Sequence, residues 1–242
     1  MKSKIIGLTV LLILGICGFA GAEPLLKDSD VSLSGTMDYY SSYMWRGQTL
    51  DKDPVVQPGF TAGYKGFSLG YWSSMAVSED KTAGASNEID MTVSYSRSFG
   101  RLGLSAGHIA YEFPSTGFAG TKEYFVGLTV AELPFTCGLS YYNDYDDADG
   151  VKGTFTILNL GKEFAKLGEA PLNALLSYGS YGDYGAFKNG SVITIGLASS
   201  IELTEKLTAT PSLYYVSTSG DLADEALGNQ KGGIYGGFSV SF

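Results

Sequence analysis

The sequence predicts an all-β protein, a single antiparallel up-and-down transmembrane β-barrel of about 12 strands with short periplasmic turns and longer extracellular loops. Three features of the sequence predict this fold. Apolar and polar residues alternate in a series of short segments. The connections between these segments are alternately short and long. The last segment keeps its alternation up to the final residue, Phe242.

The N-terminal residues have the pattern of an export signal. Met1-Lys2-Ser3-Lys4 is positively charged, residues 5–19 are apolar, and Ala20-Gly21-Ala22 has the small residues of a cleavage site. We expect residues 1–22 to be a signal peptide and residues 23–242 to be the barrel. No later stretch is a continuous apolar run of membrane-helix length. A mature protein in the membrane would therefore be a closed barrel, since only helices and closed barrels satisfy every backbone group in lipid.

The composition is that of a β-rich, turn-rich and acidic chain. It has 33 Gly, 17 Tyr and 13 Phe against 7 Pro. Removing the two signal-segment lysines changes the formal charge from −9 to −11. This balance argues against nucleic acid as a partner, because phosphate contacts need basic side chains. One cysteine, Cys137, follows the cleavage site, so no intrachain disulfide is possible in the mature chain.

The alternating segments are the expected strands. In the first, Met37, Tyr43 and Trp45 share the face expected to meet lipid. Asp38 and Arg46 share the face expected to line the lumen. Eleven further segments follow, at residues 56–65, 67–77, 88–99, 102–113, 124–130, 135–145, 154–164, 172–178, 193–201, 207–215 and 234–242.

Three of these segments depart from a simple alternation. Between Leu104 and Ile109 the apolar residues change from even to odd positions. We expect a β-bulge near Gly107-His108 that keeps Ile109 facing lipid. The segment 154–164 is ambiguous in phase. Pro211 lacks the N–H group that a strand ladder needs, which predicts another bulge.

The lengths of the connections predict the topology. The short ones follow even-numbered segments, at residues 65–66, 100–101, 132–134, 167–170 and 204–206. The long ones follow odd-numbered segments, at residues 47–54, 77–87, 114–120, 145–153, 182–190 and 217–232. Bacterial outer-membrane barrels have short periplasmic turns and long outer loops. Both termini are therefore expected in the periplasm.

The terminal segment predicts how the barrel closes. Phe238, Val240 and Phe242 lie on one face and resemble the assembly signal in the closing strand of bacterial outer-membrane barrels. This resemblance implies outer-membrane lipid and the barrel-assembly machinery as partners. The alternative is a core strand that ends a soluble periplasmic β protein.

Charged residues on the expected inner face are mostly acidic. Arg46 and Lys65 are the bases, against eight acids. Charges inside a barrel must pair or contact water. We expect Arg46 to lie opposite Glu88 or Asp90, in a network that either lines or plugs a pore. The full inner set is Asp38, Arg46, Lys65, Glu88, Asp90, Glu112, Glu123, Asp144, Glu163 and Glu202.

Several sequence blocks resemble a known family. The clearest is S-S-Y-M-W-R-G at residues 41–47, followed by Pro54, Gln57 and Gly59. Further blocks are Gly66 to Ser74, Glu88-Ile-Asp90, Glu123-Tyr124 with Gly127, and Tyr141 to Tyr145. The chain resembles the TorF-type porin family, whose members are described as conserved hypothetical outer-membrane proteins. The resemblance implies an outer-membrane barrel that forms a pore, without an established solute.

The residues offer little for catalysis. The single histidine, His108, has only Ser105 nearby in sequence, and no G-x-S-x-G, P-loop or H-E-x-x-H motif is present. We expect no enzyme, cofactor or metal site. Asp144, Asp146, Asp147 and Asp149 form an acidic loop without EF-hand spacing, which favours a solvated loop over a cation site.

The sequence therefore predicts an outer-membrane porin-like channel for passive diffusion of small solutes. Acids in the lumen favour a weak cation preference, with Asp38, Arg46, Glu88, Asp90 and Glu123 as the selectivity residues. A homo-oligomer is compatible with this function. The alternatives are a non-conducting barrel that displays loops for adhesion or envelope contacts, and a barrel enzyme that uses His108.

Overall fold

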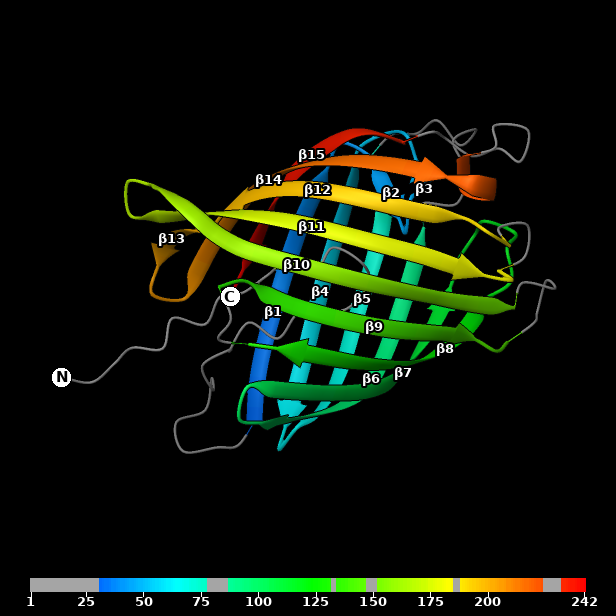
Figure 1. Ribbon diagram of the computed structural model, residues 1–242, viewed down its shortest axis with the longest axis horizontal. Coiled ribbons are helices and arrows are strands. Elements are labelled where there is room, and N and C mark those ends of the chain that lie inside the picture. Colours follow the sequence, from blue (N-terminus) through cyan, green and yellow to red (C-terminus); the bar gives the residue numbers. More distant parts are fainter. Residues whose placement is uncertain (1–30, 78–86, 132–133, 147–151, 185–187, 224–231) are drawn as a thin grey trace.

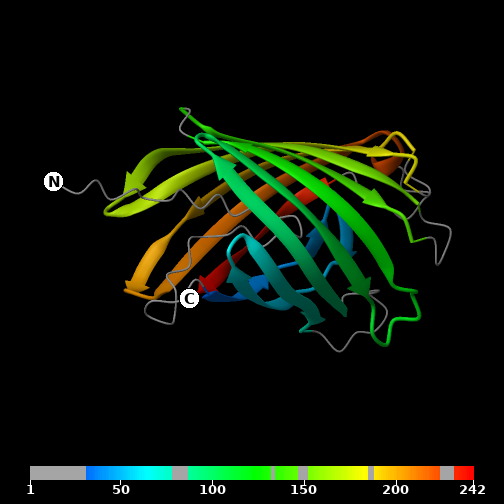
Figure 2. The ribbon, with the colours of Figure 1, turned by 90° about the horizontal axis from the view of Figure 1, so that it is seen from below.

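The computed structural model describes residues 31–77, 87–131, 134–146, 152–184, 188–223 and 232–242 (Figure 1). These residues form a closed antiparallel barrel, which confirms the predicted fold class. The predicted signal segment, residues 1–22, lies outside the described residues. Figure 2 shows the wall strands tilting across the barrel as they pass from one end to the other.

Each wall strand pairs with its neighbour along the chain, and β1 pairs with β15 to close the barrel. β12 and β13 both pair with β14 and are separated only at Ser200. Counted as one interrupted strand, they bring the wall to the expected 12. The strands are β1 (Val31–Tyr40), β4 (Val55–Tyr64), β5 (Phe67–Ala76), β6 (Glu88–Phe99), β7 (Leu102–Glu112), β8 (Thr121–Val130), β9 (Thr136–Asp144), β10 (Gly153–Leu167), β11 (Ala170–Gly182), β12 (Ser191–Ser199), β13 (Ile201–Thr204), β14 (Leu207–Ser219) and β15 (Gly232–Ser241).

The C-terminal end of the closing strand β15 and the short turns lie at the same end of the barrel. Figure 1 places the C-terminus at the same end of the barrel as the turns that join β10 to β11 and β13 to β14. The backbone N–H and C=O of Phe242 pair with those of Gly35 at 3.1 Å. A Cβ atom at Gly35 would lie 2.4 Å from the Phe242 ring, so glycine makes room for that ring. Phe238 stacks on Tyr39 with ring centroids 5.7 Å apart.

The outer face of the wall is apolar, as predicted. Large apolar side chains that the alternation placed outside are exposed, among them Met37, Leu69, Val93, Leu213 and Phe242. This surface would cost free energy in water and is suited to lipid. Among the described residues, no helix is both long enough and apolar enough to cross a membrane.

The bulge predicted near Gly107-His108 is absent. β7 pairs with β6 and β8 in continuous register through this region. Ile109 and Tyr111 therefore point into the lumen, where they are 1% and 2% exposed. The prediction was wrong because it assumed a polar lumen, whereas the interior at this level holds a hydrophobic core.

The bulge predicted at Pro211 is also absent, because Pro211 pairs in register with Phe238. The interruption falls instead on the facing strand at Ser200, between β12 and β13. The ambiguous segment 154–164 resolves into a single phase up to Gly161, with odd-numbered residues inside and even-numbered residues outside. Phe155 and Ile157 are buried in the interior, and Leu158 is exposed on the opposite face.

The largest departure from the sequence prediction is in the first long connection. β1 ends at Tyr40, and β2 (Tyr43–Trp45) and β3 (Gln48–Asp51) form a separate two-stranded hairpin. Side chains of this hairpin contact wall strands β6, β8 and β11, so it lies inside the barrel. Tyr43 and Trp45 were expected to face lipid, but Tyr43 is buried and Trp45 packs against the interior core.

Candidate functional site

The hairpin places a cation at its tip by means of a tight turn. Arg46 and Gly47 connect β2 to β3 with φ values of 49° and 86°. Two consecutive positive φ values are typical of a type I′ turn, which matches the twist of a hairpin. Gly47 also allows close packing, since a Cβ atom there would lie 2.9 Å from Leu222 Cδ2. Arg46 carries a side chain in this left-handed region, at a cost of roughly 1–2 kcal/mol.

Arg46 forms a buried, bidentate ion pair with Glu123 of β8. The Nη1–Oε1 and Nη2–Oε2 distances are 2.6 and 2.8 Å. The two residues are 3% and 0% exposed. The Tyr111 hydroxyl also donates to Glu123 Oε2, at 2.7 Å. Both carboxylate oxygens of Glu123 are therefore satisfied, as a buried charge requires.

Aromatic rings surround the Arg46 guanidinium. Its Cζ atom lies 4.4 Å from the ring centroid of Trp45, 4.3 Å from that of Tyr142 and 4.8 Å from that of Phe155. At these distances a cation is attracted to the ring faces. We call the wall residues Glu123, Tyr111, Tyr142 and Phe155, together with Trp45, the Arg46 cage.

The hairpin has two further polar attachments to the wall near the Arg46 cage. The Tyr181 hydroxyl donates to the Arg46 carbonyl oxygen at 3.0 Å, and Gln48 Nε2 donates to the Tyr181 hydroxyl at 3.0 Å. The Tyr43 hydroxyl donates to Glu88 Oε2 at 2.7 Å. These attachments all involve side chains, and β2 and β3 form a sheet of their own that does not extend the wall sheet.

Acidic groups outnumber basic ones in this part of the lumen. Glu88 and Asp90 of β6 are 2% and 5% exposed, and Glu123 is fully buried. Asp90 Oδ1 has no hydrogen-bond partner among the described residues. Within the same described part of the chain, Arg46 is the only buried cationic side chain. The site therefore gathers three buried acidic side chains around one cation.

The structure brings together four of the five predicted selectivity residues. Arg46, Glu88, Asp90 and Glu123 meet around the hairpin, although Arg46 pairs with Glu123 rather than with Glu88 or Asp90. Asp38 lies elsewhere on the inner face, opposite Ser239 and Gln57. Other predicted inner charges are exposed instead, namely Lys65, Glu112, Glu163 and Glu202. Glu112 moves to the outer face because β7 has no bulge.

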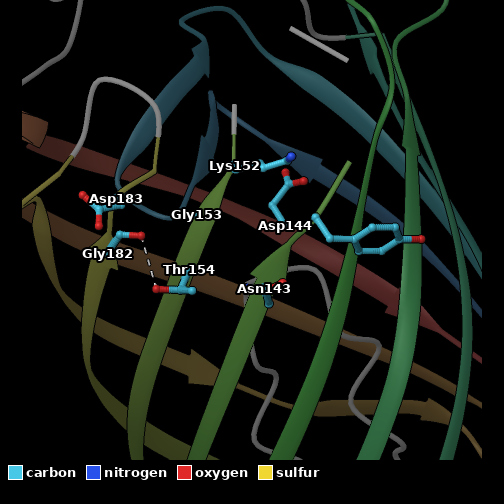
Figure 3. Close-up of a pocket in the computed structure, with 8 residues that line it drawn as sticks. Asn143, Asp144, Lys152, Gly153, Thr154, Gly182 and Asp183 are labelled. Carbon is cyan, nitrogen blue, oxygen red and sulfur yellow. Dashed lines mark hydrogen bonds between the residues drawn. The ribbon is translucent and has the colours of Figure 1, made fainter. Parts of the chain in front are cut away.

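A separate pocket of about 570 Å³ lies where β9 and β11 end and β10 begins, outside the Arg46 cage. Figure 3 shows the side chains of Asp144 and Lys152 turned toward one another in this pocket. Thr154 Oγ1 donates to the Gly182 carbonyl oxygen at 3.3 Å. Of the predicted acidic loop, Asp147 and Asp149 lie outside the described residues. Within the described ranges, no group of three or more His, Cys, Asp or Glu side chains could hold a metal ion.

A second, smaller gap of about 160 Å³ separates the hairpin from β15. Met44 and Thr49 border it on the hairpin side, and Ile234 and Tyr235 border it on the wall side. The hairpin therefore packs tightly against β8 through Arg46 and more loosely against β15.

His108 lies on the outer face of β7. Its Nε2 atom is 2.8 Å from the Tyr145 hydroxyl, and its ring contacts Tyr124 edge to face. Ser105 has the opposite phase in the strand and points to the other face. The two residues considered for catalysis therefore do not meet.

The aromatic members of the Arg46 cage were missed in the sequence. Tyr111 and Phe155 belong to the two segments whose alternation was irregular or ambiguous. Tyr142 belongs to the segment 135–145, where the odd-numbered apolar residues were expected to face lipid and the even-numbered Tyr142 was not considered. The signal was available, because apolar residues occurred on both faces of these segments. Such a pattern is expected where a barrel wall contacts lipid outside and a packed core inside.

A family model described as "Bacterial protein of unknown function (Gcw_chp)" matches residues 25–142. No curated protein matches the chain significantly. Arg46, Glu88, Asp90, Glu123 and Tyr142 all lie within the matched part. The TorF-type resemblance stays a prediction.

Two solved porins share the fold. A structure titled "NanC porin structure in rhombohedral crystal form" covers 87% of this chain and 99% of its own, with a TM-score of 0.56 and 13% identity. The structure titled "KdgM porin" covers 86% of this chain and 98% of its own, with a TM-score of 0.55 and 12% identity. At these identities the likeness establishes a porin-like barrel fold.

Proposed function

We propose that this protein is an outer-membrane, porin-like channel for small solutes whose lumen is closed at rest by the β2–β3 hairpin. The observation that carries the proposal is the bidentate Arg46–Glu123 pair, which holds the hairpin across the interior. Support for the channel comes from the closed barrel, its apolar outer face and its likeness to two solved porins. The predicted signal segment at residues 1–22 and the apolar face of β15 also support the outer membrane as its location.

The buried charges support a cation preference for this channel. With the hairpin displaced, Glu88, Asp90 and Glu123 would remain on the wall without the neutralising guanidinium. A lumen lined by fixed carboxylates favours cations over anions. We propose that passage is passive diffusion through the lumen.

The test compares the wild-type protein with a variant in which residues 42–53 are replaced by a short Gly-Ser linker. Heat-modifiable gel migration confirms that each barrel is folded. In planar bilayers we expect brief, rare openings of the wild type and steady conductance of the variant. Reversal potentials in a salt gradient should show cation preference in the variant. Glu88→Gln with Asp90→Asn should reduce that preference, whereas Glu112→Gln on the outer face should not.

The packed interior favours a second candidate, a non-conducting barrel that displays its loops for adhesion or envelope contacts. Among the described residues, sixteen buried apolar side chains form the core, with Tyr43 of the hairpin among them, and they leave the interior filled at this level. A folded deletion variant that conducts no better than a protein-free bilayer would reject the channel and support this candidate.

A further inference from the structure

We propose that the wall part of the Arg46 cage is a binding site for small organic cations bearing a guanidinium or amidinium group, and that Arg46 occupies it as an internal mimic of such a solute. This inference rests on the proposed channel only for the route by which the solute arrives. Binding itself depends on the wall residues Glu123, Tyr111, Tyr142 and Phe155.

The wall residues fit the shape of a planar cation. Glu123 presents both carboxylate oxygens to the two terminal nitrogens of Arg46, at 2.6 and 2.8 Å. This fork geometry matches a guanidinium or amidinium group, which offers parallel N–H donors, better than it matches a compact ammonium. The Tyr111 hydroxyl donates to the same carboxylate and fixes its orientation.

The rings add selectivity for a flat, weakly hydrated cation. Tyr142 and Phe155 belong to the wall strands β9 and β10, and their ring centroids lie 4.3 and 4.8 Å from Arg46 Cζ. Both rings therefore remain in the wall if the hairpin leaves. Guanidinium groups stack on aromatic faces more readily than ammonium groups, which retain their water.

The charge balance also favours an external cation. Glu88 and Asp90 face the same interior, so the wall stays acidic even while Arg46 neutralises Glu123. Asp90 Oδ1 lacks a hydrogen-bond partner among the described residues. The hairpin and the solute compete for the Glu123 carboxylate.

The test uses Trp45 as a reporter, because the chain has only two tryptophans and Trp72→Phe leaves Trp45 alone. Arg46→Ala in this background vacates the site beside Trp45 and the wall rings. Millimolar guanidinium chloride should then change the Trp45 emission in a saturable manner. Urea, which is flat but neutral, and ammonium, which is charged but compact, should not do so at the same concentration.

Two further variants decide whether the wall residues form the site. Adding Glu123→Gln should raise the half-saturating guanidinium concentration by at least about tenfold, while adding Glu112→Gln should leave it unchanged. A protein with its native Arg46 should need more guanidinium than Arg46→Ala, because Arg46 competes. Arg46→Lys, which keeps a cation at the hairpin tip, provides a second folded protein if Arg46→Ala does not fold.

The outcomes separate this inference from the proposed channel. Saturable guanidinium binding that depends on Glu123 supports the site even if no variant conducts. Emission changes that are linear, equal with urea, or indifferent to Glu123→Gln would overturn the site, even if the deletion variant conducts well.

Discussion

The chain uses the same tight turn twice, in opposite surroundings. Arg46-Gly47 has φ values of 49° and 86°, and Lys65-Gly66 has φ values of 49° and 90°. Both turns place a basic residue before glycine and connect two antiparallel strands. Arg46 is 3% exposed in the lumen, whereas Lys65 is exposed at the end of the barrel and lies over the Tyr64 ring. The difference shows that local sequence sets the turn, while the surroundings decide what its cation does.

The largest expected contrast between the two turns is in stability. Arg46→Ala leaves the buried Glu123 carboxylate without its counter-charge, so we expect a loss of about 3–5 kcal/mol in the free energy of unfolding. Lys65→Ala changes an exposed side chain and should stay within roughly 0.5 kcal/mol. Urea unfolding in lipid vesicles, followed by tryptophan fluorescence, measures both. Equal losses would show that Glu123 does not depend on Arg46.

Replacing the glycine of either turn with alanine should lower the free energy of unfolding by a similar amount, but the two variants should differ in conductance. Alanine at either position is strained by the positive φ, and the added Cβ also meets Leu222 beside Gly47 or the Ser96 carbonyl oxygen beside Gly66. We expect each variant to lose about 1–3 kcal/mol in unfolding free energy. Only Gly47→Ala should raise channel opening, because only that turn lies in the lumen. Unfolding titrations and bilayer recordings test the two halves of this statement.

A smaller contrast concerns the tyrosines near each turn. Tyr43→Phe removes the hydroxyl that donates to the buried Glu88, with an expected loss of about 1–2 kcal/mol in unfolding free energy. Tyr64→Phe alters a half-exposed ring on the outer surface and should have little effect. The same unfolding titration compares them. A Tyr43→Phe variant as stable as Tyr64→Phe would mean that the hairpin is not anchored at Glu88.

The strands of the wall and their lipid-facing residues could be predicted from the sequence, whereas the contacts inside the barrel could not. Lipid imposes one rule on every outward position, so residues such as Leu69, Val93 and Leu213 could be assigned by alternation alone. The short turns and the closing strand at Phe242 follow from the same local patterns. These predictions are confirmed by the closed barrel and its exposed apolar face.

The interior depends on contacts between distant residues. Tyr43 and Trp45 continue the outward phase of β1 in sequence, yet the chain turns at Ser41-Ser42 and carries them inside. Tyr111 faces inward and packs against Trp45 of the hairpin, a contact that no local pattern reveals. Arg46 and Glu123 were both named as lumen residues, but their pairing across 77 positions required the fold.

Closure of the lumen by the Arg46 turn is tested most directly by single-channel conductance. Arg46→Ala and Lys65→Ala each remove one basic residue from the same kind of turn, so overall charge and turn geometry are matched. We expect Arg46→Ala to open more often and conduct more than the wild type, and Lys65→Ala to match the wild type. Identical recordings from the two folded variants would contradict closure of the lumen by Arg46.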